Sequence, residues 1–124
     1  MLNRGSLILV RNQTRHAVLA DAAEIAETSK QRRIGLLRHT RLDRGQGLWI
    51  VPCESVHTFF MKFAIDLVYL DRHHKVRKVR SNMIPWHISA CLSAHSILEL
   101  PAGTVAATGT QRGDQLQIER AAAR

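Results

Sequence analysis

The fold is decided by residues 65–81, which read IDLVYLDRHHKVRKVRS. An apolar run, 65–70, is followed by a polar connection, 71–75, and then by a basic segment in which apolar residues recur. Two strand-like segments joined by so short a link form a hairpin, and the strands of a hairpin are antiparallel. We therefore predict an antiparallel pair of strands at 65–70 and 76–81.

Further short apolar runs on both sides predict that this hairpin belongs to a larger sheet. We expect additional strands at 7–10, 17–20, 48–51, 96–100 and 115–119. Residues 56–63 alternate, so that His57, Phe59, Met61 and Phe63 would share one face if the segment were extended. Residues 85–93 are expected to be irregular. Because most of the links are short, most neighbouring strands should be antiparallel.

Two short helices complete the expected fold. Thr28 and Gln31 have the spacing of a capping box, which predicts a helix over 29–38. Pro101 suits the first turn of a second helix, which Gly109 can end. The class is α+β: one compact domain over residues 1–119, with a curved, mainly antiparallel sheet or partly closed barrel. Residues 120–124 are expected to form a frayed tail.

The composition places limits on the setting of the protein. The chain has 124 residues and a formal net charge of +8, with 14 Arg and 4 Lys. Its two cysteines are too few for a disulfide scaffold, and no apolar run is long enough for a secretory signal or a membrane span. We expect a cytoplasmic protein that does not enter a membrane. The basic segments 30–44 and 72–80 leave weak nucleic-acid or anionic-surface binding open.

The stretch from Cys53 to Asp66 holds most of the groups that could do chemistry. It places a thiol, an imidazole, a hydroxyl, a thioether and a carboxylate in a mostly apolar run, where polar groups are costly unless they are paired. Cys53 and His57 could start a nucleophilic pair if a turn brought them together. With His87 and Cys91 they would make a tetrahedral zinc set, although the spacing is atypical.

Two isolated acids lie inside predicted strands. Asp66, between Ile65 and Leu67, needs a partner, for which His57 is one candidate. Glu99, between Leu98 and Leu100, either faces solvent on the outer side of its strand or caps the helix that begins at Pro101. The sequence leaves both alternatives for Glu99 open.

Several motifs together resemble the domain of unknown function 192 (DUF192) family, over about residues 20–118. They are Gly35-Leu36-Leu37-Arg38, Gly47-Leu48-Trp49-Ile50, His57-Thr58-Phe59-Phe60-Met61, Ile65-Asp66-Leu67-Val68-Tyr69-Leu70-Asp71, Leu98-Glu99-Leu100-Pro101-Ala102-Gly103 and Gly113-Asp114. The resemblance implies a compact α+β domain with a barrel-like sheet and no established activity. The positions that recur in the family fall here on Gly35, Arg38, His57, Thr58, Met61, Asp66, Glu99, Gly103 and Asp114. The chain departs from the family pattern at Leu37, where Met is frequent, and at His73-His74, where the hairpin often turns through Asp-Gly.

The leading hypothesis is a small non-enzymatic binding module for a small polar ligand or a peptide end. Its expected ligand-binding residues are His57, Thr58, Met61, Asp66 and Arg38, because a few polar groups in an apolar site orient a ligand. We assign no catalytic residue, metal ligand or cofactor from the sequence. One alternative is a hydrolase or metal-dependent enzyme that uses Cys53, His57 and Asp66, with His87 and Cys91 as further candidates. The other is the nucleic-acid or anionic-surface binding described above. The oligomeric state is left open.

Overall fold

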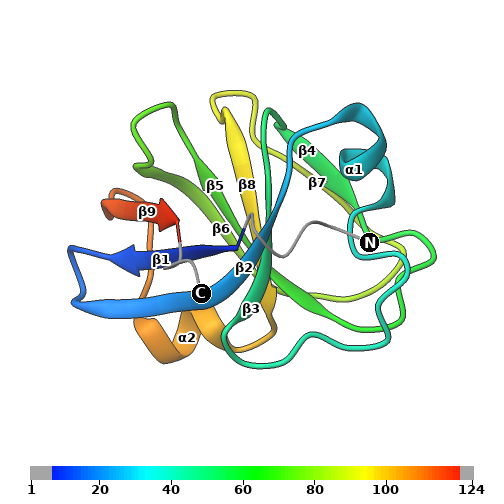
Figure 1. Ribbon diagram of the computed structural model, residues 1–124, viewed down its shortest axis with the longest axis horizontal. Coiled ribbons are helices and arrows are strands. Elements are labelled where there is room, and N and C mark those ends of the chain that lie inside the picture. The colour runs from blue at the N-terminus through cyan, green and yellow to red at the C-terminus, as the bar shows by residue number, and fades with distance from the viewer. Residues whose placement is uncertain (1–6, 121–124) are drawn as a thin grey trace.

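Most of the chain folds into one curved sheet. A computed structural model describes residues 7–120 and places them in nine strands and two short helices (Figure 1). The strands are β1 (Ile8–Asn12), β2 (Ala17–Ala26), β3 (Gln46–Ile50), β4 (Ser55–His57), β5 (Ile65–Leu70), β6 (Val76–Met83), β7 (Ile88–Ala90), β8 (Ser96–Pro101) and β9 (Leu116–Arg120). The helices are α1 (Ser29–Ile34) and α2 (Thr104–Thr108).

The large sheet has seven strands in the order β6-β5-β8-β3-β2-β1-β9. Its neighbouring strands are antiparallel except for β2 and β3, which pair in parallel. The two edges approach each other at a bridge between Lys75 and Gln115, where the Val76 amide donates to the Asp114 carbonyl at 2.8 Å. The α+β class, the β5–β6 hairpin and the partly closed barrel are thus confirmed. β9 includes Arg120, and the rest of the expected tail, 121–124, lies outside the described residues.

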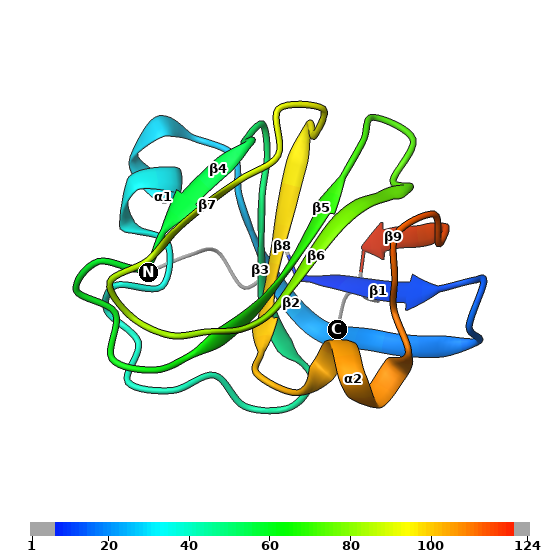
Figure 2. The same ribbon diagram turned by 180° about the vertical axis from the view of Figure 1, so that it is seen from behind.

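The central strands β5 and β8 are covered on both faces. All six residues of β5 and the first five of β8 are buried. Because side chains alternate along a strand, Leu67 and Ile97 belong to one apolar layer and Val68 and Leu98 to the other. α1 and the β4–β7 ribbon lie at one end of the molecule, and α2, β1 and β9 lie at the other (Figure 2). The two faces of β8 therefore meet different surroundings.

α1 begins where the sequence predicts and ends earlier. The Thr28 hydroxyl accepts from the Gln31 amide at 3.1 Å, and the Gln31 side chain accepts from the Thr28 amide, so the capping box is confirmed. The helix ends at Ile34 instead of residue 38, because Gly35 takes a φ of 49°, which other residues rarely adopt. Within residues 7–120, no helix has the length and apolar character needed to span a membrane.

The segment 56–63 is not extended throughout, which corrects the prediction from its alternation. Only β4 is a strand, and the chain then turns at Thr58, whose carbonyl accepts the amides of Met61 and Trp86. Phe60 lies in this turn with a φ of 67°. The segment 85–93 likewise contains β7, which pairs with β4. The two short strands stabilise each other across a long sequence separation, and a local pattern does not show such pairing.

α2 also begins later than the sequence predicts. Pro101 is the last residue of β8, and the helix starts at Thr104 after Gly103. The Asp66 carboxylate accepts the amides of Gly103 and Val105 at 3.1 and 2.8 Å and so takes the capping role considered for Glu99. The helix ends at Gly109, as predicted.

Candidate functional site

A cavity of about 370 Å³ opens between α1 and the sheet. We call it the α1 pocket. It is lined by α1 and the turn after it between residues 29 and 37, by Ile50 at the end of β3, by the segment between Cys53 and Met61, and by Glu99 of β8. This volume is typical of a site for a small molecule. The pocket therefore collects side chains from four separate parts of the chain.

Glu99 places a carboxyl group on the sheet side of this pocket. The residue is only 4 % exposed, and its neighbours Leu98 and Leu100 pack into the opposite apolar layer. No hydrogen bond or ion pair joins the Glu99 carboxyl to any other residue between 7 and 120. Burial raises its pKa to about 7, from an ordinary value of 4.5. The carboxyl is therefore about half protonated near neutral pH and has no partner other than what enters the pocket.

The α1 side of the pocket is positively charged. Arg32 and Arg33 lie in the last turn of the helix, where cations are favoured by the helix dipole. Nη1 of Arg32 donates to the Glu27 carbonyl at 2.6 Å, which fixes the direction of that side chain. Arg33 is exposed, and within the described residues its guanidinium has no hydrogen-bond partner. Neither arginine forms an ion pair with Glu99 across the cavity.

Cys53 and His57 both line the pocket, yet they do not form a nucleophilic pair. The Cys53 thiol donates to the Ser55 carbonyl at 3.1 Å, and among residues 7–120 no hydrogen bond joins Cys53 to His57. Burial raises the pKa of the Cys53 thiol, and the nearby Glu99 adds to the rise while Arg32 opposes it. A thiol whose pKa is raised is a poor nucleophile near neutral pH, since the thiolate is the reactive form.

The zinc set considered from the sequence is not assembled. Cys53 and Cys91 are both free thiols, and no group of three His, Cys, Asp or Glu side chains within residues 7–120 has a geometry that could hold a metal ion. Nδ1 of His87 lies 3.0 Å from the Pro85 carbonyl. Cys91 and His87 are also absent from the lining of the α1 pocket.

Of the five residues predicted to bind a ligand, the structure brings two together in the α1 pocket. These are His57 and Met61. Thr58 lies next to them but is fully buried, and its hydroxyl donates to the Ile84 carbonyl at 2.7 Å. Arg38 is exposed and does not line the pocket.

Asp66 lies on the opposite face of the sheet from Glu99. Its carboxylate accepts three backbone amides, from Asn82, Gly103 and Val105, at 2.8 to 3.1 Å. Asp66 is fully buried, and these bonds satisfy its carboxylate. His57 is not one of its partners. Asp66 therefore positions the start of α2 and the end of β6.

An aromatic stack leads away from the pocket at His57. The His57 ring stacks on Phe59 with centroids 4.9 Å apart, and Phe59 stacks on Trp86 at 5.7 Å. Phe60 meets the edge of Trp86 at 4.8 Å. Phe60 and Trp86 are 70 % and 60 % exposed, so this wall of the pocket continues as an apolar surface.

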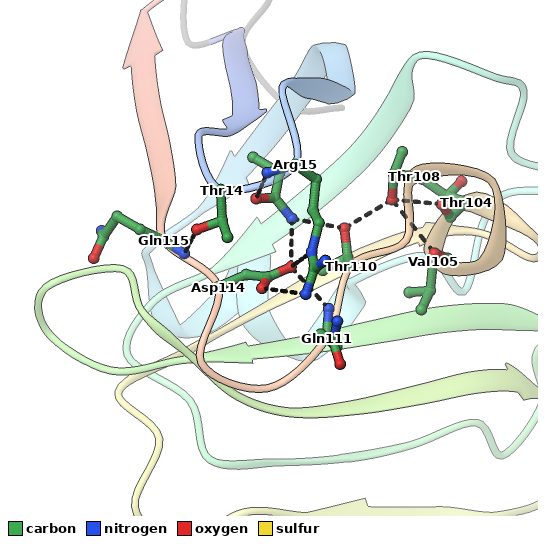
Figure 3. A network of polar contacts seen from close by, with 10 residues as sticks. Thr14, Arg15, Thr104, Val105, Thr108, Thr110, Gln111, Asp114 and Gln115 are labelled. Carbon is green, nitrogen blue, oxygen red and sulfur yellow. Dashed lines mark hydrogen bonds and ion pairs between the residues drawn. The ribbon is translucent and has the colours of Figure 1, made fainter.

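A second polar cluster, far from the pocket, has a structural role (Figure 3). The buried Asp114 carboxylate accepts from Arg15 Nε at 3.0 Å, from the Asn12 amide group at 2.9 Å and from the Gln111 amide at 3.0 Å. The Thr14 hydroxyl accepts the Gln115 amide at 2.9 Å. Together these bonds join the β1–β2 turn to the turn before β9.

Two parts of the basic segments considered for nucleic-acid binding lie far apart. α1, within segment 30–44, lies at one end of the molecule, while the turn between β5 and β6 at 71–75 lies toward the other end in both views (Figures 1 and 2). Within segment 72–80, Arg77 donates to the Ser93 hydroxyl and Lys78 to the Ala90 carbonyl.

Sequence reasoning missed the residues that give the pocket its charge. Segment 30–44, which contains the arginines of α1, was considered for nucleic-acid or anionic-surface binding, and Glu99 for an outward-facing or capping role. The sequence carried one signal for Glu99, a single acid between leucines in a strand, but the same signal is present at Asp66.

Two solved structures share this fold. A protein from Sinorhizobium meliloti 1021, described as a "putative transcription regulator", superposes with a TM-score of 0.78 at 20% sequence identity, covering 89% of this chain and 90% of that one. A protein of unknown function from Novosphingobium aromaticivorans superposes with a TM-score of 0.74 at 19% identity, covering 90% and 83%. At such identities the likeness establishes the fold alone.

The sequence is also similar to two curated archaeal proteins. A UPF0127 protein of Thermococcus sibiricus is 28% identical over 114 residues, which cover 87% of this chain and 73% of that protein. The UPF0127 protein PH1112 of Pyrococcus horikoshii is 27% identical over 115 residues, covering 88% and 97%. The DUF192 family model, whose description reads "Uncharacterized ACR", matches residues 9–118. The chain belongs to the DUF192 family of uncharacterised proteins.

Proposed function

We propose that this domain is a binding module that holds a small polar ligand in the α1 pocket. The observation that carries the proposal is the Glu99 carboxyl, which is almost fully buried, lines the cavity and has no partner within the described residues. Burial disfavours the charged form of this carboxyl, and groups whose pKa is shifted in this way cluster at functional sites. A ligand that pairs with Glu99 would offset the cost of its ionised form.

The walls of the pocket fit a ligand that is polar at its ends. His57 and Met61 supply two of the predicted contacts, and Ile34, Ile50 and Val56 supply apolar surface. Thr58 would act indirectly, by holding the turn after β4. Asp66 faces the opposite layer of the sheet and holds the start of α2, away from the pocket. For a peptide end in the pocket, the aromatic stack beyond His57 would contact the rest of the peptide.

Binding is favoured over the hydrolase alternative by the state of Cys53. Its thiol is held by the Ser55 carbonyl, and its pKa is raised instead of lowered. The metal-dependent alternative would need at least three ligands in one place, and no such group occurs among residues 7–120. A non-catalytic role of the α1 pocket therefore requires fewer changes in side-chain position than the hydrolase or metal-dependent alternative.

The test is a screen of several hundred polar metabolites by thermal unfolding. A ligand present at about a hundred times its dissociation constant stabilises the folded state by roughly 2.7 kcal/mol. We expect hits whose stabilisation is lost in Glu99→Gln and weakened in His57→Ala. Glu119→Gln is the matched control, since Glu119 is an exposed acid on β9. Hits that stabilise Glu99→Gln as well as the wild type, or a screen without hits, would contradict the proposal.

A further inference from the structure

The α1 pocket has two charged sides that face the same cavity and do not neutralise each other. Arg32 and Arg33 lie on the helix side, and Glu99 lies on the sheet side. The three ion pairs found within residues 7–120 join other residues, so the arginine and glutamate groups are more than 4.0 Å apart. Because both sides line one cavity of about 370 Å³, we expect a single ligand in it to contact both.

The other residues that line the pocket are mostly apolar or uncharged. Leu37, Ile50, Val56 and Met61 line the cavity, as does the neutral Cys53 thiol. Such a lining suits a ligand with a short apolar body. The cavity of about 370 Å³ is large enough for an amino acid and too small for a long peptide.

We infer that the α1 pocket takes a small zwitterion of the α-amino-acid class, with its ammonium group at Glu99 and its carboxylate at Arg33 and Arg32. This inference rests on the proposed binding function and names the ligand class for the same site. Within the described residues the Arg33 guanidinium makes no hydrogen bond, whereas Arg32 already donates to the Glu27 carbonyl and the Ser29 hydroxyl. Arg33 is therefore the expected main partner of the carboxylate.

Simpler ligands change the charge inside the pocket. An anion without an ammonium group could pair with the arginines, but its charge would hold Glu99 in the protonated form, so its binding should take up a proton. A cation without a carboxylate could pair with Glu99, but it would lie in the field of two guanidinium groups. A zwitterion pairs with both sides and brings no net charge into the cavity.

Binding of the ammonium group has a consequence for protons. Glu99 has a pKa of about 7 and is about half protonated at pH 7. The charged and titratable groups around it are Arg32 and Arg33 from α1 and Cys53 and His57 from the segment around β4. β3 and β5 place Leu48 and Leu67 opposite Glu99 in the sheet. An ammonium beside Glu99 favours the ionised carboxylate, so binding should release about half a proton at pH 7.

The experiment is isothermal titration with a panel of L-amino acids at pH 7. For the tightest binder, the N-acetyl derivative lacks the ammonium group and the amide derivative lacks the carboxylate. Each derivative should bind about ten- to a hundredfold more weakly, the usual effect of losing a hydrogen bond to a charged group. Titrations in two buffers of different ionisation enthalpy measure the proton exchange. We expect release of about half a proton, absent in Glu99→Gln.

A second variant tests the other side of the pocket without disturbing the core. Arg33→Gln changes an exposed side chain and should weaken binding of the amino acid. Binding of the amide derivative should stay unchanged or become slightly stronger, since the amide has no carboxylate and one nearby cation is removed. Arg112→Gln, at an exposed arginine before β9, is the matched control and should bind as the wild type does.

The outcomes separate this inference from the proposed function. If metabolites from the broader screen bind at Glu99 but no amino acid does, the zwitterion inference is wrong and the binding function stands. Proton uptake on binding, or equal affinity for the N-acetyl derivative, would likewise show an anion site and overturn the inference. If nothing binds in either experiment, the zwitterion inference and the proposed binding function are both wrong.

Discussion

The unpartnered Glu99 carboxyl should make the stability of this domain depend on pH in a particular direction. In the folded protein its pKa is about 7, against 4.5 for the ordinary group. Between these two values the folded state holds a proton that the unfolded chain has lost. Protonation therefore favours folding at low pH, and the contribution of Glu99 falls as the pH rises through 7.

The Glu99→Gln variant isolates this effect. From pH 5 to pH 8, the two pKa values predict that wild type loses about 2 to 3 kcal/mol of folding free energy that the variant keeps. Glutamine has nearly the same shape, so any fixed cost of the substitution cancels when the difference between variant and wild type is compared at the two pH values.

The assay is urea-induced unfolding of wild type and Glu99→Gln at pH 5 and pH 8. The difference matters because other groups also titrate in this window. Burial lowers the pKa of His74, which makes the stability rise with pH. In the wild type measured by itself, this rise would mask part of the effect of Glu99, but it is common to both proteins and cancels in their difference. Glu119→Gln, at an exposed acid, should show no such pH-dependent gain. The reasoning is refuted if Glu99→Gln differs from wild type by the same amount at both pH values.

Three further results are expected. Asp66→Ala should lower the free energy of unfolding by about 2 to 4 kcal/mol in urea, since three buried backbone amides lose their acceptor; a change below 1 kcal/mol would contradict its capping role. Burial raises the pKa of Asp114, but hydrogen bonds from Arg15 and Asn12 outweigh it and the net pKa is lowered. The stabilisation by Asp114 should be present above pH 3.8 and lost at lower pH. In an acid titration, the free energies of unfolding of wild type and Asp114→Ala should therefore differ above pH 3.8 and converge at lower pH. Cys53 should react with iodoacetamide more slowly at pH 7.5 in the folded than in the urea-unfolded protein, as mass spectrometry can follow; faster labelling when folded would revive the nucleophile hypothesis.

The parts of the fold that depend on neighbouring residues could be predicted from the sequence. The capping box at Thr28 and Gln31 is complete within four residues, and the β5–β6 hairpin is set by one short connection. The glycine that ends α2 is equally local. In each case the chemistry that fixes the element lies inside the stretch that predicts it.

The parts that depend on distant partners could not be predicted. β4 and β7 exist because residues around 56 and 89 pair with each other, and neither is a convincing strand alone. β2 continues to Ala26 because its second half pairs in parallel with β3. The end of α1 is a different case. Gly35 is part of the sequence, but a glycine alone does not show that its φ will be positive and end the helix there.

The candidate site shows the same limit at two acids. Asp66 and Glu99 each interrupt an apolar strand, with Leu or Ile on both sides. On paired strands β5 and β8, Asp66 is opposite Leu100 and Glu99 is opposite Leu67. Their side chains therefore face opposite layers of the sheet. Which layer each acid faces determines whether it meets backbone amides, as Asp66 does, or a pocket, as Glu99 does. The amides that satisfy Asp66 lie 16 to 39 residues away in the sequence. The helix that forms the other side of the Glu99 pocket lies still farther from Glu99 in the sequence.

The contrast between these acids also argues that Glu99 is not a structural residue. Asp66 is fully buried and accepts three hydrogen bonds, so its burial is compensated and supports the fold. Glu99 is buried nearly as deeply without such bonds, and its ionised form costs the folded state roughly 3 kcal/mol above pH 7, a large share of the 5 to 15 kcal/mol that usually stabilises a domain. Leucine would serve the apolar layer, and glutamine would avoid the charge. We therefore propose that the partner of this titratable group enters the pocket from outside the fold.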